Sequence, residues 1–343
     1  MKKRIGIMTG GGDAPGLNGI IEASSRVLLQ NGCEVVGIRD GFEGVFDQQI
    51  VPLTLDVVEN AHALAGTLLG SSNKSGIKGR EKEFAANFER LNLDGLIACG
   101  GDGTFAGLSL VRETVPLIGV PKTIDNDLAG TEATFGFDTA CSVVAENVDA
   151  LRFTAEAHRR LFVVETMGRT SGWIALGGGL ASYADVILIP ERPFDRGSLV
   201  EFVRQKKKAR RELMIVVSEG AAAAGEDPSV AFHVEGSPQS ERFGGVAAQL
   251  ARWLEQETDW EARHVVLGHL QRSRAPTTTD RFLTSFMGVE AARMAIEGVW
   301  EQAIVYRSGR IQRAPLTDLM QPPRLVTPDH RWVKQAQKLG LWI

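Results

Sequence analysis

Residues 95–104, GLIACGGDGT, join a short apolar run directly to a turn that holds three glycines and one aspartate. An apolar run of this length that ends in glycine and precedes a helix-like segment is typical of a buried strand in a parallel sheet. In open α/β sheets, ligands bind outside the carboxyl ends of the strands. The stretch therefore predicts an α/β fold with a ligand site beside Asp102.

The same succession of a Val- and Ile-rich run and a helix-like segment recurs along the 343 residues. The expected strands are 4–8, 34–38, 95–99, 117–120, 161–165, 186–189, 214–217 and 264–267. The expected helices are 17–30, 81–91, 103–112, 138–153, 171–182, 199–211, 245–257 and 281–297. This alternation predicts parallel-rich sheets flanked by helices. Because no low-complexity linker divides the chain, we expect two interleaved Rossmann-like lobes rather than two successive domains.

The composition narrows the class of function. The net charge is −4 and 43% of the residues are hydrophobic, so we expect a soluble protein that binds neither nucleic acid nor a membrane. The one dense basic run, RQKKKARR at 204–211, is typical of the solvated end of a helix. Three cysteines without C-x-x-C spacing indicate reduced thiols and a cytoplasmic protein.

Two glycine-rich turns indicate contact with phosphate. The first, TGGGDAPGLN at 9–18, lies between an expected strand and an expected helix, where backbone N–H groups and the helix dipole favour an anion. It matches neither the G-x-x-x-x-G-K-[ST] loop nor the dinucleotide-binding pattern. In the second turn, Asp102 would hold a divalent metal against phosphate oxygens. Taken alone, the first could be a tight turn without a ligand, and Asp102 could be a helix N-cap.

Seven motifs occur in order along the chain: GGGDAPGLN, GGDGT, PKTIDND, TFGFDTA, ETMGR, SEG and GHLQR. Together they resemble the 6-phosphofructokinase family, within the phosphofructokinase A superfamily, and are most similar to the subgroup that combines GGDGT with PKTIDND. The resemblance covers residues 4–300. It implies the phosphofructokinase fold and an Mg²⁺-assisted kinase of glycolysis that phosphorylates D-fructose 6-phosphate at its 1-hydroxyl.

On the phosphoryl-donor side, the resemblance assigns roles to three carboxylates. Asp125 matches the base that takes the proton from the sugar 1-hydroxyl, Asp127 matches a supporting carboxylate, and Asp102 matches the Mg²⁺ ligand. Phosphoryl transfer requires alignment of nucleophile and donor and neutralisation of charge, which a base, a metal and cations supply. The further residues expected near the donor or the transferred group are Gly11, Asn73, Lys74, Gly101, Gly103, Thr104, Lys122 and Thr123.

On the sugar-phosphate side, the resemblance implies a set of contacts that includes Thr123 and Asp125. The others are Met167, Gly168, Arg169, Glu219, His269 and Arg272, of which Arg169 is also expected to act in catalysis. Arg160 and Arg263 match two arginines that reach the 6-phosphate from a neighbouring subunit, which implies a homo-oligomer, by family habit a homotetramer. We expect the donor lobe to comprise 1–136 and about 273–310, and the sugar lobe 137–272 and about 311–343.

The resemblance favours ATP as the phosphoryl donor. Pyrophosphate-dependent relatives carry a second aspartate after GGD, whereas Gly103 leaves room for a nucleotide. Lys122 occurs in pyrophosphate-dependent members and in a subgroup of ATP-dependent ones, so pyrophosphate remains the alternative donor. A non-catalytic sugar-phosphate sensor on the same scaffold is the alternative from another class.

The chain also departs from the family pattern. Asn73-Lys74 stands where many ATP-dependent relatives have an arginine. Glu22 stands where effector-regulated relatives have an arginine, so we expect no activation by ADP. Ser273-Arg274 replaces a Gly-Gly pair, which leaves a longer sugar phosphate such as sedoheptulose 7-phosphate open as a substrate. Residues 312–343 match no motif and are expected to serve packing.

Overall fold

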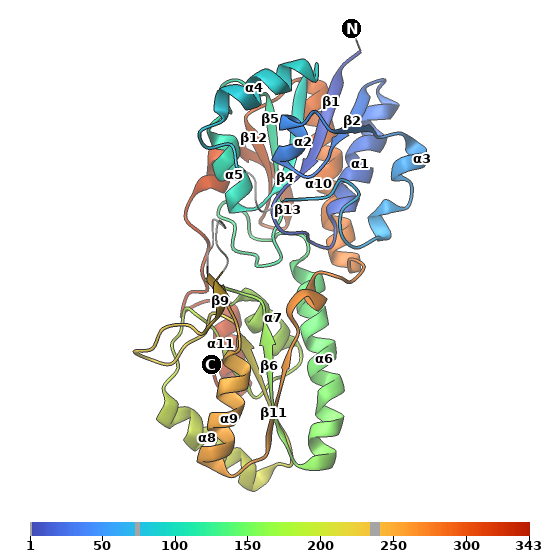
Figure 1. Ribbon diagram of the computed structural model, residues 1–343. Helices are drawn as coiled ribbons and strands as arrows, with labels where there is room; N and C mark the ends of the chain where they lie inside the picture. The colour runs from blue at the N-terminus through green and yellow to red at the C-terminus, as the bar shows by residue number, and fades with distance from the viewer. Residues whose placement is uncertain (1, 73–75, 234–240) are drawn as a thin grey trace. The chain divides into compact units, whose positions relative to one another are not determined.

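The computed structural model describes residues 2–72, 76–233 and 241–343, and the chain forms two compact units. Unit 1 comprises Met1–Thr139 and Arg272–Pro323, and unit 2 comprises Ala140–Gln271 and Arg324–Ile343 (Figure 1). Each unit is built from two separate stretches of the sequence, so the chain is interleaved. Three expected boundaries differ from the structure, because residues 137–139, Arg272 and residues 311–323 lie in unit 1. The largest difference arises because the strand at Arg310–Pro315 pairs within the unit 1 sheet.

Unit 1 contains a seven-stranded sheet with the order β13-β12-β5-β4-β1-β2-β3. Its five central strands run parallel, and β3 and β13 pair antiparallel at the two edges. The strands are β1 (Arg4–Thr9), β2 (Glu34–Ile38), β3 (Ile50–Pro52), β4 (Gly95–Gly100), β5 (Leu117–Pro121), β12 (Gln302–Arg307) and β13 (Arg310–Pro315). The carboxyl ends of the parallel strands all lie along the edge of the sheet that runs across the strands. The glycine-rich turns follow the strands at this edge.

Helices cover both faces of this sheet (Figure 1). Ile97 and Cys99 of β4 face a core shared with α1 (Leu17–Gln30) and α10 (Thr278–Glu297). Leu96 and Ala98 face the opposite core. That core is shared with α2 (Phe42–Phe46), α4 (Glu81–Arg90) and α5 (Asp102–Ser109). This alternation of faces along a wholly apolar strand explains why the strand reads as a continuous hydrophobic run.

Unit 2 contains a four-stranded parallel sheet with the order β11-β6-β8-β7 and a separate antiparallel pair of β9 and β10. The strands are β6 (Leu161–Thr166), β7 (Val186–Leu188), β8 (Leu213–Ser218), β9 (Val230–His233), β10 (Glu241–Phe243) and β11 (Ala262–Val266). The helices are α6 (Phe137–His158), which begins in unit 1, α7 (Trp173–Ala181), α8 (Arg196–Ala209), α9 (Val246–Thr258) and α11 (Arg331–Lys338). α8 and α9 share a core with one face of the sheet, and α7 packs against β7 and β8.

The C-terminal segment packs onto unit 2. Trp173 at the start of α7 is buried and donates from its indole Nε1 to the carbonyl of Arg324 at 2.7 Å. Glu191 accepts from the N–H of Gly172 at 3.0 Å and from the N–H of Val326 at 2.9 Å. The carboxylate therefore joins the tail to the residue that precedes α7. At the end of the chain, the N–H of Ile187 in β7 donates to the carbonyl of Trp342.

Each expected strand and helix overlaps an observed one. The α-helices and strands that were not expected are α2, α3 (Leu55–Val58), α11, β3, β9, β10, β12 and β13, and most of them are short or lie at an edge of a sheet. Cys33 and Cys99 are buried, and burial raises the pKa of the Cys99 thiol to about 12, so this thiol is unreactive at neutral pH. Among the described residues, no helix is both long enough and apolar enough to cross a membrane.

Candidate functional site

The carboxyl ends of β1, β4 and β5 lie side by side in unit 1. Thr9 at the end of β1 is level with Cys99 in β4, and Gly100 at the end of β4 is level with Pro121 at the end of β5. The loops that follow these strands therefore meet at one edge of the sheet. They carry the donor-side candidates, as the strand pattern of the sequence predicts.

The loop after β1 is held by hydrogen bonds from its surroundings. The N–H of Gly10 donates to the carbonyl of Cys99 at 2.9 Å, and the hydroxyl of Ser71 donates to the carbonyl of Gly11. Two cationic side chains also reach this loop. The Lys122 ammonium donates to the carbonyl of Gly12, and the Arg272 guanidinium donates to the carbonyl of Asp13. Positive charge is thus concentrated beside the first glycine-rich turn.

The loop after β4 places Asp102 at the first position of α5. Gly101 is the N-cap residue of that helix, so the reading of Asp102 as the N-cap is wrong. Thr104 in the first turn is buried, and its hydroxyl faces Gly10 of the neighbouring loop. A Cβ atom built on Gly103 would have no described atom within 4 Å, so this position borders open space.

The loop after β5 carries the PKTIDND motif. Lys122 is only 3% exposed, and Asp125 is half-buried. The N–H of Asp125 donates to the hydroxyl of Thr123 at 3.1 Å. Asn126, between Asp125 and Asp127, has a positive φ of 53°, which is a left-handed conformation.

The charged groups of this edge perturb one another. Burial raises the pKa of Asp102, and the negative charge of Asp125 raises it further. Burial also raises the pKa of Asp125, although the cations of Arg272 and Lys122 and the Thr123 hydrogen bond oppose the shift. Burial lowers the pKa of Lys122 to about 8, with a further lowering by Arg272. Two acids and one base with shifted pKa values at one sheet edge are typical of a catalytic site.

The carboxylates at this edge suit an Mg²⁺ ion that is bound mainly by the phosphate oxygens of a substrate. Within the described part of the chain, no group of three His, Cys, Asp or Glu side chains could hold a metal ion. Mg²⁺ in phosphoryl-transfer sites commonly uses one or two carboxylates, water and substrate phosphate oxygens. A divalent cation at Asp102 would also offset the repulsion between the Asp102 and Asp125 carboxylates.

The sugar-phosphate candidates of unit 2 follow the carboxyl ends of its parallel strands. Residues 167–169 follow β6, Glu219 follows β8, and His269 lies in the short helix η2 (Gly268–Gln271) after β11. The N–H of Glu219 donates to the carbonyl of Thr166 at 2.9 Å. Gly168 has a φ of 127° and leaves no space for a side chain against Ser218 and Ser171. A glycine is therefore required at the turn that presents Arg169.

Arg169 is partly exposed and has two described partners. Its guanidinium lies 3.9 Å from a carboxylate oxygen of Glu241 and 4.7 Å from the ring centroid of Phe243. Both partners belong to β10. An arginine held by one distant ion pair and one ring keeps N–H groups available for a phosphate.

Arg160 and Arg263 do not join the other unit 2 candidates. Arg160 precedes β6 and forms an ion pair with Glu261 at 2.9 Å, and Arg263, near the start of β11, pairs with the same carboxylate. Because β6 has six residues at about 3.3 Å each, these arginines lie roughly 20 Å from Met167, at the opposite edge of the sheet.

The remaining sequence candidates fall into three cases. Asn73 and Lys74 lie outside the described residues. Arg272, which was expected with the sugar lobe, belongs to unit 1 beside the first glycine-rich turn. Glu22 is buried in unit 1. Burial raises its pKa, but hydrogen bonds from His62 and Arg26 outweigh that effect and lower it, so the carboxylate stays charged.

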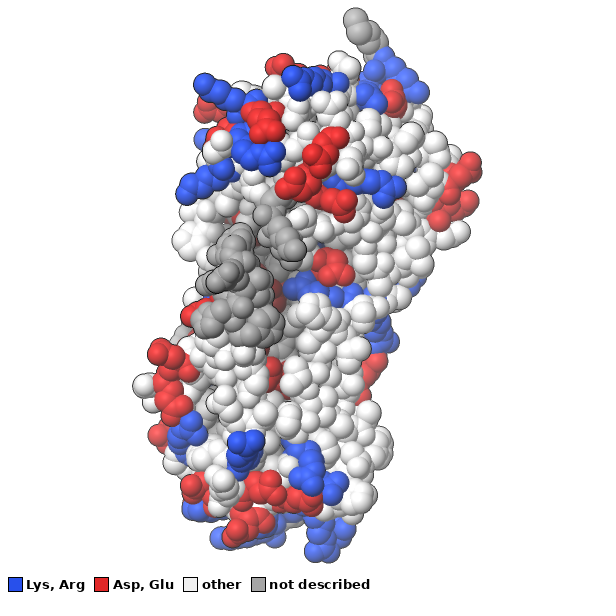
Figure 2. Space-filling view, viewed as in Figure 1, with Lys and Arg blue, Asp and Glu red and all other residues white. Residues whose placement is uncertain are grey.

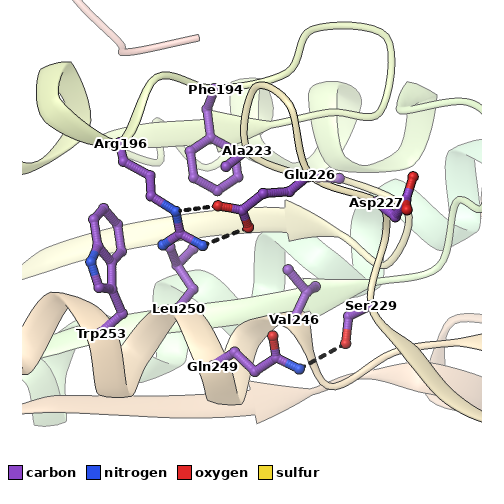
Figure 3. Close-up of a pocket in the computed structure, with 12 residues that line it drawn as sticks. Phe194, Arg196, Ala223, Glu226, Asp227, Ser229, Val246, Gln249, Leu250 and Trp253 are labelled. Atoms are coloured by element: carbon purple, nitrogen blue, oxygen red, sulfur yellow. Dashed lines mark hydrogen bonds and ion pairs between the residues drawn. The ribbon is translucent and has the colours of Figure 1, made fainter.

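Unit 2 also contains a pocket of about 260 Å³ beside the starts of α8 and α9 (Figure 3). Four of its polar side chains pair with one another, because Arg196 pairs with Glu226 at 2.7 Å and Gln249 donates to Ser229 at 2.9 Å. Its lining residues include none of the candidates from the sequence. On the face that Figure 2 shows, Lys and Arg side chains are mixed with Asp and Glu, without a continuous field of one sign.

Comparison with known proteins identifies the family. The family model described as "Phosphofructokinase" matches residues 4–295. The chain belongs to the phosphofructokinase family. Among its phosphofructokinase relatives, an "ATP-dependent 6-phosphofructokinase" of Mycobacterium tuberculosis is 42% identical over 98% of this chain and 100% of the relative. A "Pyrophosphate--fructose 6-phosphate 1-phosphotransferase" of Amycolatopsis methanolica is 41% identical over 95% of this chain and 97% of the relative.

A solved phosphofructokinase has the same fold. The phosphofructokinase of Pichia pastoris in the T-state superimposes with a TM-score of 0.83 and 30% sequence identity. The match covers 93% of this chain and 35% of the Pichia chain. The two phosphofructokinase relatives of similar identity differ in the donor that their names state, so overall similarity does not select a donor for this chain.

Proposed function

We propose that this protein transfers the terminal phosphoryl group of ATP to the 1-hydroxyl of D-fructose 6-phosphate, which yields fructose 1,6-bisphosphate and ADP. The observation that carries the proposal is that Asp102, Lys122 and Asp125, each with a pKa shifted mainly by burial, lie at one edge of the unit 1 sheet beside a glycine-rich turn. Paired acids and a buried cation fit phosphoryl transfer better than they fit a sensor, which needs no base.

Asp125 is the general base in this proposal. Its carboxylate takes the proton of the 1-hydroxyl while the oxygen forms a bond to the terminal phosphorus and the bond from that phosphorus to the bridging oxygen breaks. The Lys122 ammonium and the Thr123 hydroxyl neutralise charge on the transferred group, and Asp127 supports the base. Mg²⁺ at Asp102 would supply further neutralisation of the phosphate charge.

The unit 2 cluster would hold the sugar phosphate. Arg169 suits the phosphate because its guanidinium keeps its charge and binds oxygen pairs. Glu219 and His269, which follow neighbouring parallel strands, would bind sugar hydroxyls. Fructose 6-phosphate is favoured over longer sugar phosphates by the family of the chain.

ATP is favoured over pyrophosphate by Gly103. The position borders open space at the first turn of α5, so a nucleotide beyond the transferred phosphate would meet no side chain there. Pyrophosphate remains the second candidate, because a relative named for pyrophosphate is as similar to this chain as one named for ATP.

A donor assay tests the proposal directly. The purified protein is incubated with fructose 6-phosphate, Mg²⁺ and either ATP or pyrophosphate, and fructose 1,6-bisphosphate is measured. We expect product with ATP. Product with pyrophosphate alone would overturn the choice of donor, and binding of fructose 6-phosphate without turnover would identify a sensor.

Replacing Gly103 by Asp should select against ATP. The new carboxylate would add bulk and negative charge where the nucleotide passes, so kcat/KM for ATP should fall about 100-fold, or about 2.7 kcal/mol. Activity with pyrophosphate, if present, should fall far less. Gly103→Asn serves as the neutral control of similar size. Equal losses of kcat/KM with ATP and with pyrophosphate in Gly103→Asp would contradict the inference that Gly103 favours ATP.

We further propose that the protein is a homotetramer in which Arg160 and Arg263 serve the site of a neighbouring subunit. Their position at the opposite edge of the unit 2 sheet from Met167 supports this reading. Inactive Arg160→Ala and Asp125→Asn proteins, dissociated and reassembled together, should regain activity, because some mixed sites contain both native residues. Each variant reassembled alone is the control. If verified hetero-oligomers of the two variants recover no activity, the sites are not shared between subunits.

A further inference from the structure

Thr134 holds the chain on both sides of Asp125. Its hydroxyl donates to the carbonyl of Thr123 at 2.6 Å, and its backbone N–H donates to the side-chain carbonyl of Asn126 at 3.0 Å. Thr134 is 2% exposed, so water competes little for either bond. A single residue thus fixes the chain two positions before Asp125 and one position after it.

The conformation of Asn126 makes the second bond important. Asn126 adopts a left-handed φ of 53°, which asparagine tolerates better than most residues but which still costs free energy. Its side chain is buried, and its amide oxygen accepts the Thr134 N–H. The bond therefore stabilises the left-handed residue that lies between Asp125 and Asp127.

We infer that Thr134 is a positioning residue for Asp125, an inference that rests on the proposed function of Asp125 as the base. The Asp125 backbone is held locally, since its N–H donates to the Thr123 hydroxyl at 3.1 Å, and that hydroxyl lies 3.5 Å from a carboxylate oxygen of Asp125. Thr123 is in turn held by Thr134 through its carbonyl. A general base must lie within hydrogen-bond reach of the proton that it removes, and displacement by about 1 Å can cost 10²-fold in rate.

The same loop provides a matched control. Thr131 is also buried, at 4% exposure, and its hydroxyl donates to the carbonyl of Ala133 at 2.9 Å. That hydroxyl also accepts from the N–H of Tyr306 in β12 at 3.0 Å. Thr131 thus connects the loop to the sheet, whereas Thr134 connects it to the Asp125 segment. Valine at either position removes a buried hydroxyl and nearly preserves volume.

Kinetics of three variants test the inference. Thr134→Val should lower kcat about 10- to 100-fold while the KM values for fructose 6-phosphate and the donor change less than about three-fold. Thr134→Ser, which keeps the hydroxyl, should restore kcat to within about three-fold of the native value. Thr131→Val should lower the melting temperature about as much as Thr134→Val but leave kcat within about three-fold. Equal kcat losses in the two valine variants would overturn the inference.

Hydrogen exchange separates this inference from the proposed function. Thr134→Val should accelerate exchange in peptides that contain the Asp125 amide and leave those that contain the Tyr306 amide unchanged, and Thr131→Val should do the reverse. If this exchange pattern is found but the native protein shows no turnover, the proposed function is wrong and the contacts of Thr134 are still as described. Uniform acceleration in both variants would overturn the positioning role. If Thr134→Val does not fold, Asn126→Gly removes the other of the two bonds, the one from the Thr134 N–H to the Asn126 amide oxygen, and should give the same loss of kcat and the same faster exchange at the Asp125 amide.

Discussion

Replacing Asp125 by Asn should lower kcat by about 10²- to 10⁴-fold, the range that general bases contribute. The KM values for fructose 6-phosphate and the donor should change only a few-fold, because the proton is transferred in the transition state rather than in the bound ground state. Asparagine keeps the shape of the side chain and the Thr123 contact, so the loss would reflect the missing base. Steady-state kinetics with each donor would measure it.

Asp127→Asn is the matched control for this experiment, because it removes a carboxylate two positions away in the same motif. We expect a smaller loss of kcat, since Asp127 supports the base but does not accept the proton. A large increase in the KM for fructose 6-phosphate with kcat retained in Asp125→Asn would show that Asp125 binds the sugar and is not the base.

Replacing Lys122 by Met should lower kcat about 10²- to 10³-fold, comparable to the loss of one transition-state donor in other enzymes. Lys122 is buried, donates to the carbonyl of Gly12 and lies near the carboxylate of Asp125, so its charge acts in a partly desolvated site. Methionine fills nearly the same space without the charge. Lys122→Arg keeps the charge and is the matched control.

The pH dependence of kcat provides the second readout for Lys122. Its pKa of about 8 means that the ammonium is charged below pH 8 and loses its charge above it, so kcat should fall as the pH rises through 8. The raised pKa of Asp125 means that the base is protonated as the pH falls, so kcat should also fall on the acid side. The apparent pKa values belong to the interacting set.

The alkaline limb should disappear in Lys122→Met and move to higher pH in Lys122→Arg, because the guanidinium does not lose its proton in this range. An unchanged alkaline limb in Lys122→Met would assign that limb to another group. An unchanged kcat in Lys122→Met would contradict a role for Lys122 in catalysis.

Local sequence signals determined most of the fold because the central strands are buried on both faces. Residues 95–100 and 117–121 are wholly apolar runs followed by glycine or polar turns, so their strand character is visible without tertiary information. The edge strand β13 is half-exposed and rich in arginine and glutamine, and its pairing with β12 depends on a partner that lies outside any short window. For that reason the sequence alone does not place residues 311–323 in unit 1.

The motifs indicate which residues belong to the site, but they do not indicate which contacts hold those residues in place. Nothing in PKTIDND or TFGFDTA indicates that the hydroxyl and N–H of Thr134 hold the chain on either side of Asp125. Thr134 lies in TFGFDTA and Asp125 lies in PKTIDND. Membership of these motifs is the only signal for either residue that the sequence contains. The N-cap of α5 also required the structure, since residue type alone favours Asp102 as the cap, whereas the helix uses Gly101.

The amino-acid sequence by itself determined the parallel α/β architecture, the glycine-rich turns and the identity of the acids and cations, because these depend on residue type and on spacing along the chain. Only the tertiary structure decided which of these groups share an edge of a sheet. It grouped Lys122, Asp125 and Arg272 with the first turn, and it separated Arg160 and Arg263 from Met167. The physical reason is that strand order and register, which bring residues far apart in the sequence into contact, follow from burial over the whole sheet rather than from any local pattern.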